Sequence, residues 1–269
     1  MLSLIFPIYN RADLFKPTLE ALAQQHYPRD EYEILVIDDG STDHLQKLCR
    51  TFRTIQELPL RYCKIDVWRL PFEIFAWNGA NNPAPAINVG IRGARFPRIV
   101  LSSPEIVYTQ ATNLLRMATW PLAEHEALIG NVWDESMRDH PELQGYISGG
   151  PRQRYLHFLG VFPTAQLRTI GGMEEAFIEA WGAEDAEFTE RWLAAGGTYL
   201  FAHQSVTATH QWHPRPYWGE TPGEEGVLDA VKRGDRLCDA IRADPARRLQ
   251  ANIGRPWGST DLIVEREGW

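Results

Sequence analysis

Two adjacent acidic residues, Glu184 and Asp185, stand directly before a predicted amphipathic helix. Phe188 and Trp192 follow at helical spacing, and the glycine pair at 196–197 predicts the end of the helix. Both acidic residues therefore fall in its first turn, where free backbone N–H groups and the helix dipole favour ionised carboxylates. The pair could supply a general base, or it could merely decorate a helix N-terminus, as acidic residues often do. Taken alone, the pair does not separate these interpretations.

Polar residues also follow two predicted strands in the first part of the chain. The apolar runs at 2–6 and 32–37 predict buried strands, and each one ends in a short polar segment. In a doubly wound sheet, ligands bind beyond the carboxyl ends of the strands. Tyr9 could therefore stack on a base while Asp39 accepts a hydrogen bond from the same nucleotide. An Asp-Gly turn alone is an ordinary tight turn, so the pairing of the two strand ends carries the prediction of a nucleotide site.

Strands and helices alternate through the first hundred residues. After the first two strands and their helices, the pattern predicts a strand at 60–65, a helix at 84–94 and a strand at 99–101. The fold class predicted is α/β, with a Rossmann-like, mostly parallel sheet flanked by helices. The segment 109–168 is less regular and is interpreted as loops that frame a pocket.

The composition changes again near residue 214, where prolines and glycines precede a helix-like segment at 227–241. We therefore predict a catalytic domain at residues 1–215. We expect residues 216–269 to form a C-terminal helical extension packed on or beside that domain.

The bulk composition excludes several functional classes. A chain of 269 residues with 44% hydrophobic content can bury a full core. Its formal net charge of −8 argues against nucleic acid as a partner. Cys49, Cys63 and Cys238 lack metal-ligand spacing and are expected to be reduced, buried thiols. The sequence contains no apolar run near the roughly 18 residues that span a bilayer, so we expect a cytoplasmic protein, with peripheral membrane contact left open.

The motifs together resemble family 2 of the glycosyltransferases, which has the GT-A fold, over about residues 1–213. The resemblance rests on Tyr9-Asn10-Arg11, on the Asp-Asp-Gly-Ser sequence at 38–41 and on the sequence Ala-Ile-Asn-Val-Gly-Ile at 86–91. In the last of these, isoleucine replaces the arginine usual in the family. The stretch 167–175, followed by the Trp-Gly-Ala-Glu-Asp sequence at 181–185, is similar to galactosyl- and N-acetylgalactosaminyltransferases.

This resemblance implies a site for a nucleotide-sugar donor and a divalent metal. The implied donor-binding residues are Pro7, Tyr9, Asn10, Arg11, Asp38, Asp39, Asn88 and Ser103. Where the family has an Asp-x-Asp metal motif, this chain has Ser103-Pro104-Glu105, which keeps one carboxylate. Glu105 and His210 are the implied ligands of Mn²⁺ or Mg²⁺, and the imidazole favours manganese.

The same resemblance assigns the acidic pair to the acceptor side. Asp185 would act as the general base on the acceptor hydroxyl, Glu184 would orient the acceptor, and Trp181 and Gly182 would contact it. The implied reaction moves a sugar from a UDP-linked donor to a hydroxyl of a carbohydrate acceptor. Inversion is expected, because the sequence offers one base and no clear second nucleophile.

Two alternatives stay open. The missing metal carboxylate is also typical of a catalytically degraded relative that binds nucleotide-sugar or glycan and regulates a partner. A nucleotidyltransferase would have a similar sheet, but the glycine- and lysine-rich phosphate loop that it would normally need is not evident.

Overall fold

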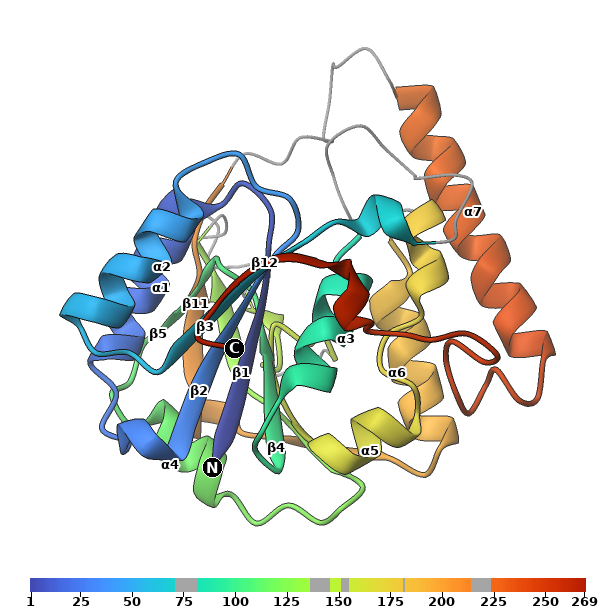
Figure 1. Cartoon of the computed structure of the whole chain (residues 1–269). Coiled ribbons are helices and arrows are strands. Elements are labelled where there is room, and N and C mark those ends of the chain that lie inside the picture. Colours follow the sequence, from blue (N-terminus) through green and yellow to red (C-terminus); the bar gives the residue numbers. More distant parts are fainter. Residues whose placement is uncertain (71–81, 136–145, 151–154, 181, 214–223) are drawn as a thin grey trace.

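The structure, a computed structural model, describes residues 1–70, 82–135, 146–150, 155–180, 182–213 and 224–269 (Figure 1). The strands are β1 (Leu2–Ile8), β2 (Tyr32–Asp38), β3 (Leu60–Ile65), β4 (Arg98–Ser102), β5 (Ile106–Tyr108), β6 (Glu126–Ile129), β7 (Asn131–Asp134), β8 (Tyr146–Ser148), β9 (Leu159–Pro163), β10 (Thr198–Phe201), β11 (Thr207–His210) and β12 (Ile263–Glu267). The α-helices are α1 (Ala12–Ala23), α2 (Leu45–Ile55), α3 (Ala84–Gly93), α4 (Asn113–Thr119), α5 (Thr164–Thr169), α6 (Glu184–Ala194) and α7 (Glu224–Ala243). Among the described helices, none is long and apolar enough to cross a bilayer.

An eight-stranded sheet forms the centre of the fold, in the order β10-β6-β9-β4-β1-β2-β3-β12. Strands β1, β2, β3 and β4 run parallel, whereas β9 and β12 run against them. The carboxyl ends of the four parallel strands therefore meet at one edge, called the carboxyl edge below. A second sheet of four strands has the order β5-β11-β7-β8. The mostly parallel α/β sheet predicted from the sequence is confirmed.

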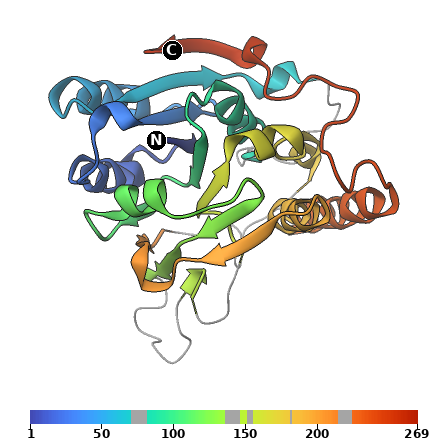
Figure 2. The same ribbon diagram turned by 90° about the horizontal axis from the view of Figure 1, so that it is seen from below.

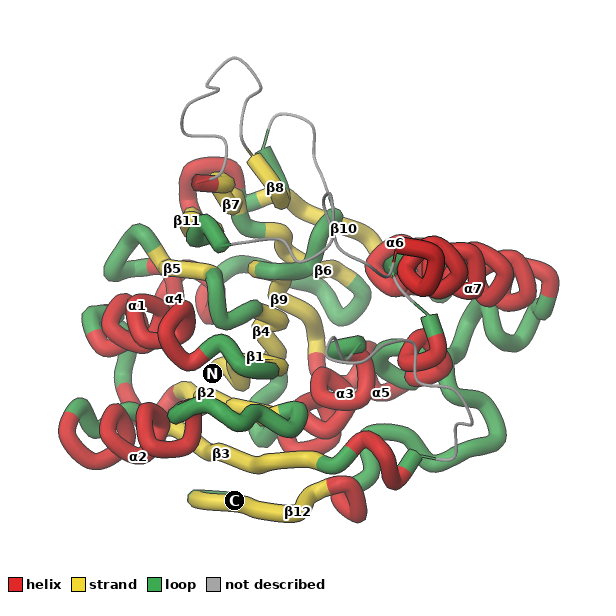
Figure 3. Tube along the Cα trace, turned by 90° about the horizontal axis from the view of Figure 1, so that it is seen from above, coloured by secondary structure: helices red, strands yellow, loops and turns green. Residues whose placement is uncertain are grey.

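Each face of the large sheet is covered by helices, because its parallel strands are buried on both sides. Every residue of β2 is buried, and β1 is buried except at Pro7. Helices α1, α2 and α4 pack on one face, and α3, α5 and α6 pack on the other (Figures 2 and 3). The apolar stripes of α1 and α6 face these two cores through residues such as Phe15 and Trp192, both fully buried.

The segment 109–168 is more regular than the sequence indicated. Its described residues form α4 and the strands β6, β7, β8 and β9 in place of the expected loops. These strands are only three to five residues long, and such short runs show too little periodicity to be recognised from sequence.

The C-terminal region contains the expected helix, α7, and also a strand, β12, that was not predicted. Strand β12 pairs antiparallel with β3 and so forms the edge of the main sheet. Nearby, the guanidinium of Arg61 lies 4.4 Å from the ring centroid of Trp269. Pairing explains the difference, because β3 would otherwise present a row of unpaired backbone groups. The domain boundary at 215 falls outside the described residues and stays a prediction.

Candidate active site

The loops after β1 and β2 are tied together at the carboxyl edge. Asn10 has a left-handed backbone, with φ of 51°, which asparagine tolerates better than most residues. Its backbone N–H donates to Ser41 Oγ at 2.9 Å, and its side-chain oxygen accepts from the Thr42 N–H at 2.8 Å. Asn10 thus joins the two loops that were predicted to form the nucleotide site. Pro7, Tyr9 and Arg11 flank this junction on the chain.

Asp38 and Asp39 have different surroundings although both are buried. The carboxylate of Asp38 accepts from the Ser41 N–H and from the Tyr62 hydroxyl, each at 2.6 Å. Both of its oxygens are therefore engaged inside the protein and shape the turn, and its contact with a donor stays a prediction. The N–H of Asp39 donates to the Ile8 carbonyl at 2.8 Å, which places Asp39 beside the end of β1.

Asn88, which was predicted to contact the donor, has its side chain turned into the protein. The residue is fully buried. Its Nδ2 donates to the Met173 carbonyl at 2.8 Å and to Glu175 Oε1 at 2.9 Å, while its Oδ1 accepts from the Met173 N–H at 2.7 Å. Every amide group of the side chain is used to hold α3 against the segment before α6, so Asn88 supports the acceptor side of the fold.

Glu105 lies in the turn between β4 and β5, where it contacts two other predicted site residues, Ser103 and Arg11. Ser103 Oγ donates to Glu105 Oε2 at 2.8 Å, and Arg11 Nε lies 3.6 Å from Glu105 Oε1. The guanidinium and the carboxylate come from different strand ends. The structure therefore brings the first polar segment and the atypical metal motif together.

His210 ends β11, where strand pairing places it opposite Asp134 on one side and Ile106 on the other. Its Nδ1 is buried and has no hydrogen-bond partner among the described residues, although it lies 3.5 Å from Asp134 Oδ1. Burial lowers the pKa of His210, and the negative charges of Asp134 and Glu105 oppose that shift. Asp134 was not predicted, because in the sequence it is only one carboxylate at the end of a short apolar run.

The residues around His210 fit a cation in part. Two carboxylates and a neutral imidazole suit Mn²⁺, and the buried Nδ1 of His210 lies 3.5 Å from Asp134 Oδ1. Within the described ranges, however, no three His, Cys, Asp or Glu side chains are placed to hold a metal ion together. The set fits a cation that one or two side chains share with phosphate oxygens of a donor, and it does not fit a preformed cage made only of protein ligands.

A sharp turn leads into α6, whose first residues were predicted to face the acceptor. Gly182 and Ala183 both have φ of 69°, and the left-handed backbone of Ala183 is strained because it carries a Cβ. Helix α6 then starts with the bond from the Glu187 N–H to the Ala183 carbonyl, 2.9 Å long. Trp181, predicted to contact the acceptor, lies outside the described residues. The turn places Glu184 and Asp185 in the first helical turn, as predicted.

Glu184 differs from the ionised carboxylate that its position suggested. Its Oε2 is enclosed and has no hydrogen-bond partner among the residues that the structure describes. Burial, and then the charge of Asp185, raise the pKa of Glu184 from its ordinary 4.5 to about 7. Enclosure therefore opposes the helix dipole at Glu184, and near neutral pH part of the population keeps its proton.

Glu184→Gln should flatten the pH dependence of stability. Since the folded-state pKa is raised, the folded protein keeps this proton after the unfolded chain has lost it, and stability falls as pH rises from about 4.5 to about 7. Urea denaturation at several pH values should show a smaller fall of the free energy of unfolding in the variant than in the wild type. Glu190→Gln, at an exposed position of the same helix, should show the same fall as the wild type. If Glu184→Gln also shows the wild-type fall, the raised pKa is contradicted.

Asp185 has a buried partner that the sequence analysis missed. His157 Nδ1 lies 3.4 Å from Asp185 Oδ1, and His157 Nε2 lies 3.1 Å from the Tyr199 hydroxyl. His157 stands just before β9, whose Leu159 pairs with Ser102 of β4. This pairing brings the acidic start of α6 to the same edge of the sheet as the Glu105 turn. A single histidine between aromatic residues gives no spacing signal that could have revealed it.

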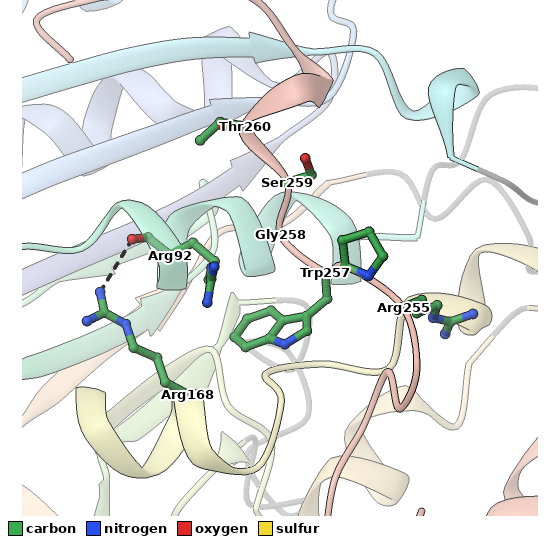
Figure 4. Close-up of a pocket in the computed structure, with 8 residues that line it drawn as sticks. Arg92, Arg168, Arg255, Trp257, Gly258, Ser259 and Thr260 are labelled. Carbon is green, nitrogen blue, oxygen red and sulfur yellow. Dashed lines mark hydrogen bonds between the residues drawn. The ribbon is translucent and has the colours of Figure 1, made fainter.

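A cavity of about 630 Å³ lies apart from this constellation, between α3, α5 and the C-terminal region (Figure 4). It is lined by Arg92, Arg168, Arg255, Pro256, Trp257, Gly258, Ser259 and Thr260. The guanidinium of Arg168 donates to carbonyl oxygens of Ile91 and Ala94 and so caps the end of α3. None of the described residues that were predicted to bind donor, metal or acceptor lines this cavity.

Solved structures with the same architecture include glycosyltransferases. A Staphylococcus aureus TarS fragment in complex with UDP-GlcNAc has a TM-score of 0.61 at 19% identity, over 91% of this chain and 67% of that chain. Mannosyltransferase PcManGT from Pyrobaculum calidifontis, in complex with GDP-Man and Mn²⁺, has a TM-score of 0.59 at 18% identity, over 91% of this chain and 76% of that one. These likenesses show the fold.

Family models cover both sides of the candidate site. Residues 3–95 match the model of glycosyl transferase family 2, and residues 150–213 match the N-terminal domain of galactosyltransferase. Residues 3–95 therefore resemble a family 2 glycosyltransferase, and the described chain has the GT-A fold. The first match contains the two strand ends of the nucleotide side. The second contains Asp185, its partner His157 and also His210.

Curated relatives of this GT-A chain are also glycosyltransferases. Validoxylamine A glucosyltransferase of Streptomyces hygroscopicus subsp. jinggangensis is 25% identical in an alignment 255 positions long, gaps included, that covers 78% of this chain and 56% of the relative. Chondroitin synthase of Escherichia coli is 36% identical in an alignment 270 positions long, gaps included, that covers 85% of this chain and 36% of the relative. The GT-A chain thus spans about half, or less, of the relatives that it matches over most of its own length.

Proposed function

We propose that the protein is a glycosyltransferase that moves a sugar from a nucleotide-sugar to a hydroxyl of a carbohydrate acceptor. One observation carries the proposal. The pairing of Ser102 with Leu159 sets the Glu105 turn beside the segment of His157, which contacts Asp185. A donor side and an acceptor side are thereby combined at the carboxyl edge, where α/β sheets bind their ligands.

The donor would lie along the loops after β1 and β2. Tyr9 and Asp39 would contact the nucleotide, and Arg11, half-buried beside Glu105, would face the diphosphate. The structural neighbours were solved with UDP-GlcNAc and with GDP-Man and Mn²⁺, which supports a nucleotide-sugar and a divalent cation here. We favour a UDP-linked donor.

Mn²⁺ or Mg²⁺ would be held by Glu105 and His210 together with the donor diphosphate, and Asp134 beside His210 extends this set. When bound, the cation supplies positive charge against the departing diphosphate. The neutral imidazole that burial favours at His210 is the form able to ligate.

Asp185 would act as the base. As the acceptor oxygen forms its bond to the anomeric carbon, the O–H proton moves to the Asp185 carboxylate, while the bond to the diphosphate breaks on the opposite side of the sugar. This single displacement inverts the anomeric centre. Glu184, with its raised pKa, would retain a proton near neutral pH and could donate a hydrogen bond to the acceptor.

A panel of UDP-, GDP- and dTDP-sugars, each with and without Mn²⁺, tests the donor site through thermal unfolding. A ligand at about 100 times its Kd should stabilise the folded state by roughly 2.7 kcal/mol, which raises the Tm by several degrees. Asp39→Asn should reduce this rise, whereas Asp13→Asn, at a side chain that is 96% exposed, should not. If no nucleotide-sugar raises the Tm of the wild type, the proposal fails.

The absence of a three-ligand cluster among the described residues favours one second candidate, a relative that binds a nucleotide-sugar but does not transfer it. The panel separates the two functions when it is followed by an assay of sugar release and transfer. Stabilisation without turnover on any acceptor would favour the binding protein. A cytoplasmic location and peripheral membrane contact stay predictions.

A further inference from the structure

We propose that His157 is a positioning residue that holds Asp185 in the orientation needed for catalysis, with Tyr199 fixing the histidine in turn. The inference rests on the proposed function, because it assigns a support to the base of that reaction. It adds a connected chain of three side chains, Asp185, His157 and Tyr199, which come from α6, from the segment before β9 and from β10.

The ring of His157 is held by its surroundings. Its side chain is only 5% exposed, whereas that of Asp185 is 35% exposed. The edges of Phe188 and Phe162 pack against it at centroid distances of 4.7 and 5.5 Å, and Tyr199 stacks on it at 5.9 Å. These contacts restrict rotation of the imidazole, so the Nδ1 that reaches Asp185 has a defined direction. The aspartate is thus accessible to an acceptor while its partner is enclosed.

The hydrogen bonds favour one arrangement of protons along this chain of side chains. Burial raises the pKa of Tyr199, so its hydroxyl keeps a proton that it can donate to His157 Nε2. His157 Nδ1 then carries a proton that it donates to Asp185 Oδ1. The other tautomer would direct a lone pair at a carboxylate. The separation of 3.4 Å is long for such a bond, as is common for catalytic contacts before substrate binds.

This arrangement divides the two oxygens of the carboxylate. Oδ1 accepts from His157, which leaves Oδ2 to take the proton of the acceptor hydroxyl. No proton passes to the histidine in this scheme. His157 only orients the Asp185 carboxylate. The strained turn at Ala183, directly before α6, helps to fix the position of the same residue.

His157→Phe and His157→Gln test the role, because phenylalanine fills the aromatic pocket without a hydrogen bond and glutamine can still donate one. The assay uses the donor identified by the thermal panel. We expect His157→Phe to lower kcat by about ten- to a hundredfold, the range seen when a residue that hydrogen-bonds to a metal ligand is replaced. The donor KM should stay within about twofold of the wild type. His157→Gln should recover part of the loss. Tyr155→Phe, a neighbour of Tyr199 at a centroid distance of 4.8 Å, should match the wild type.

The double variant His157→Phe with Asp185→Asn separates the inference from the proposed function. If His157→Phe lowers kcat in the wild type but does not lower the residual kcat of Asp185→Asn any further, the two residues act as one unit and the positioning role holds. If Asp185→Asn is inactive but both His157 variants keep a kcat within about twofold of the wild type, the positioning role is overturned. Should His157→Phe fail to fold in thermal unfolding, the kcat of a folded His157→Gln decides. Full activity of Asp185→Asn would overturn the proposed base itself.

Discussion

Asp185→Asn should lower the rate of sugar transfer by at least about a hundredfold, because general-base catalysis contributes roughly 10²- to 10⁴-fold and asparagine cannot accept the proton. The substitution preserves shape, and Asp185 is half-buried at a helix start, so the fold should persist. Donor binding should persist as well, since the donor loops are built from β1 and β2. The measurement is kcat with the preferred donor and acceptor, together with donor-induced thermal stabilisation.

A matched control is available on the same helix. Glu190 is exposed and forms an ion pair with Arg242 at 2.7 Å, away from the first turn of α6. Glu190→Gln removes one negative charge from α6, as Asp185→Asn does, and should keep nearly full activity. If both variants transfer sugar at the wild-type rate, the base has been assigned to the wrong residue.

Arg191→Met should destabilise the fold by about 3–5 kcal/mol, the range for breaking a buried ion pair from one side. Arg191 is 1% exposed and binds both oxygens of Glu187 at 2.7 and 2.9 Å. It also donates to the carbonyls of Ile170 at 3.0 Å and Gly172 at 2.8 Å, where the chain approaches α6. Methionine leaves the Glu187 charge and these carbonyls buried without their partner. Urea denaturation monitored by tryptophan fluorescence measures the change.

Arg242→Met provides the comparison, because it removes an arginine that also binds both oxygens of a glutamate on α6. That pair is half-exposed, so its loss should cost no more than about 1 kcal/mol. Adding Glu187→Gln to Arg191→Met should restore part of the stability by removing the unpaired charge. Equal losses for the two arginine variants would show that burial does not govern the strength of these pairs.

The parts of the fold that could be predicted are those with long, regular patterns. Strands β1 and β2 are mostly apolar runs because both of their faces are buried, and α6 has a clear amphipathic stripe that ends before Gly196. Strands β6 to β9 escaped prediction because each is too short to show a period. Strand β12 escaped it because Glu265 and Glu267 give it a polar composition, and only its place beside β3 makes it a strand.

The sequence predicted those site residues whose place follows from the ends of strands and helices. Motifs located Asp39, Glu105, Asp185 and His210 at strand or helix ends. They could not show that Asn88 points into the protein, because that depends on contacts across a large sequence separation. The partners His157 and Asp134 were missed for the same reason, since strand register, and no local spacing, brings them to the site. The raised pKa of Glu184 follows from enclosure, which no sequence motif encodes.

The pairing of β12 with β3 has a consequence for how this protein is made. Strand β3 leaves the ribosome long before β12 is synthesised, so one side of the growing sheet stays uncovered while most of the chain emerges. Such distant pairing is slow to form, and the nascent sheet can recruit strands of other chains during that interval. Substitutions that weaken the final strand would thus reduce the yield of soluble protein before they affect any step of catalysis.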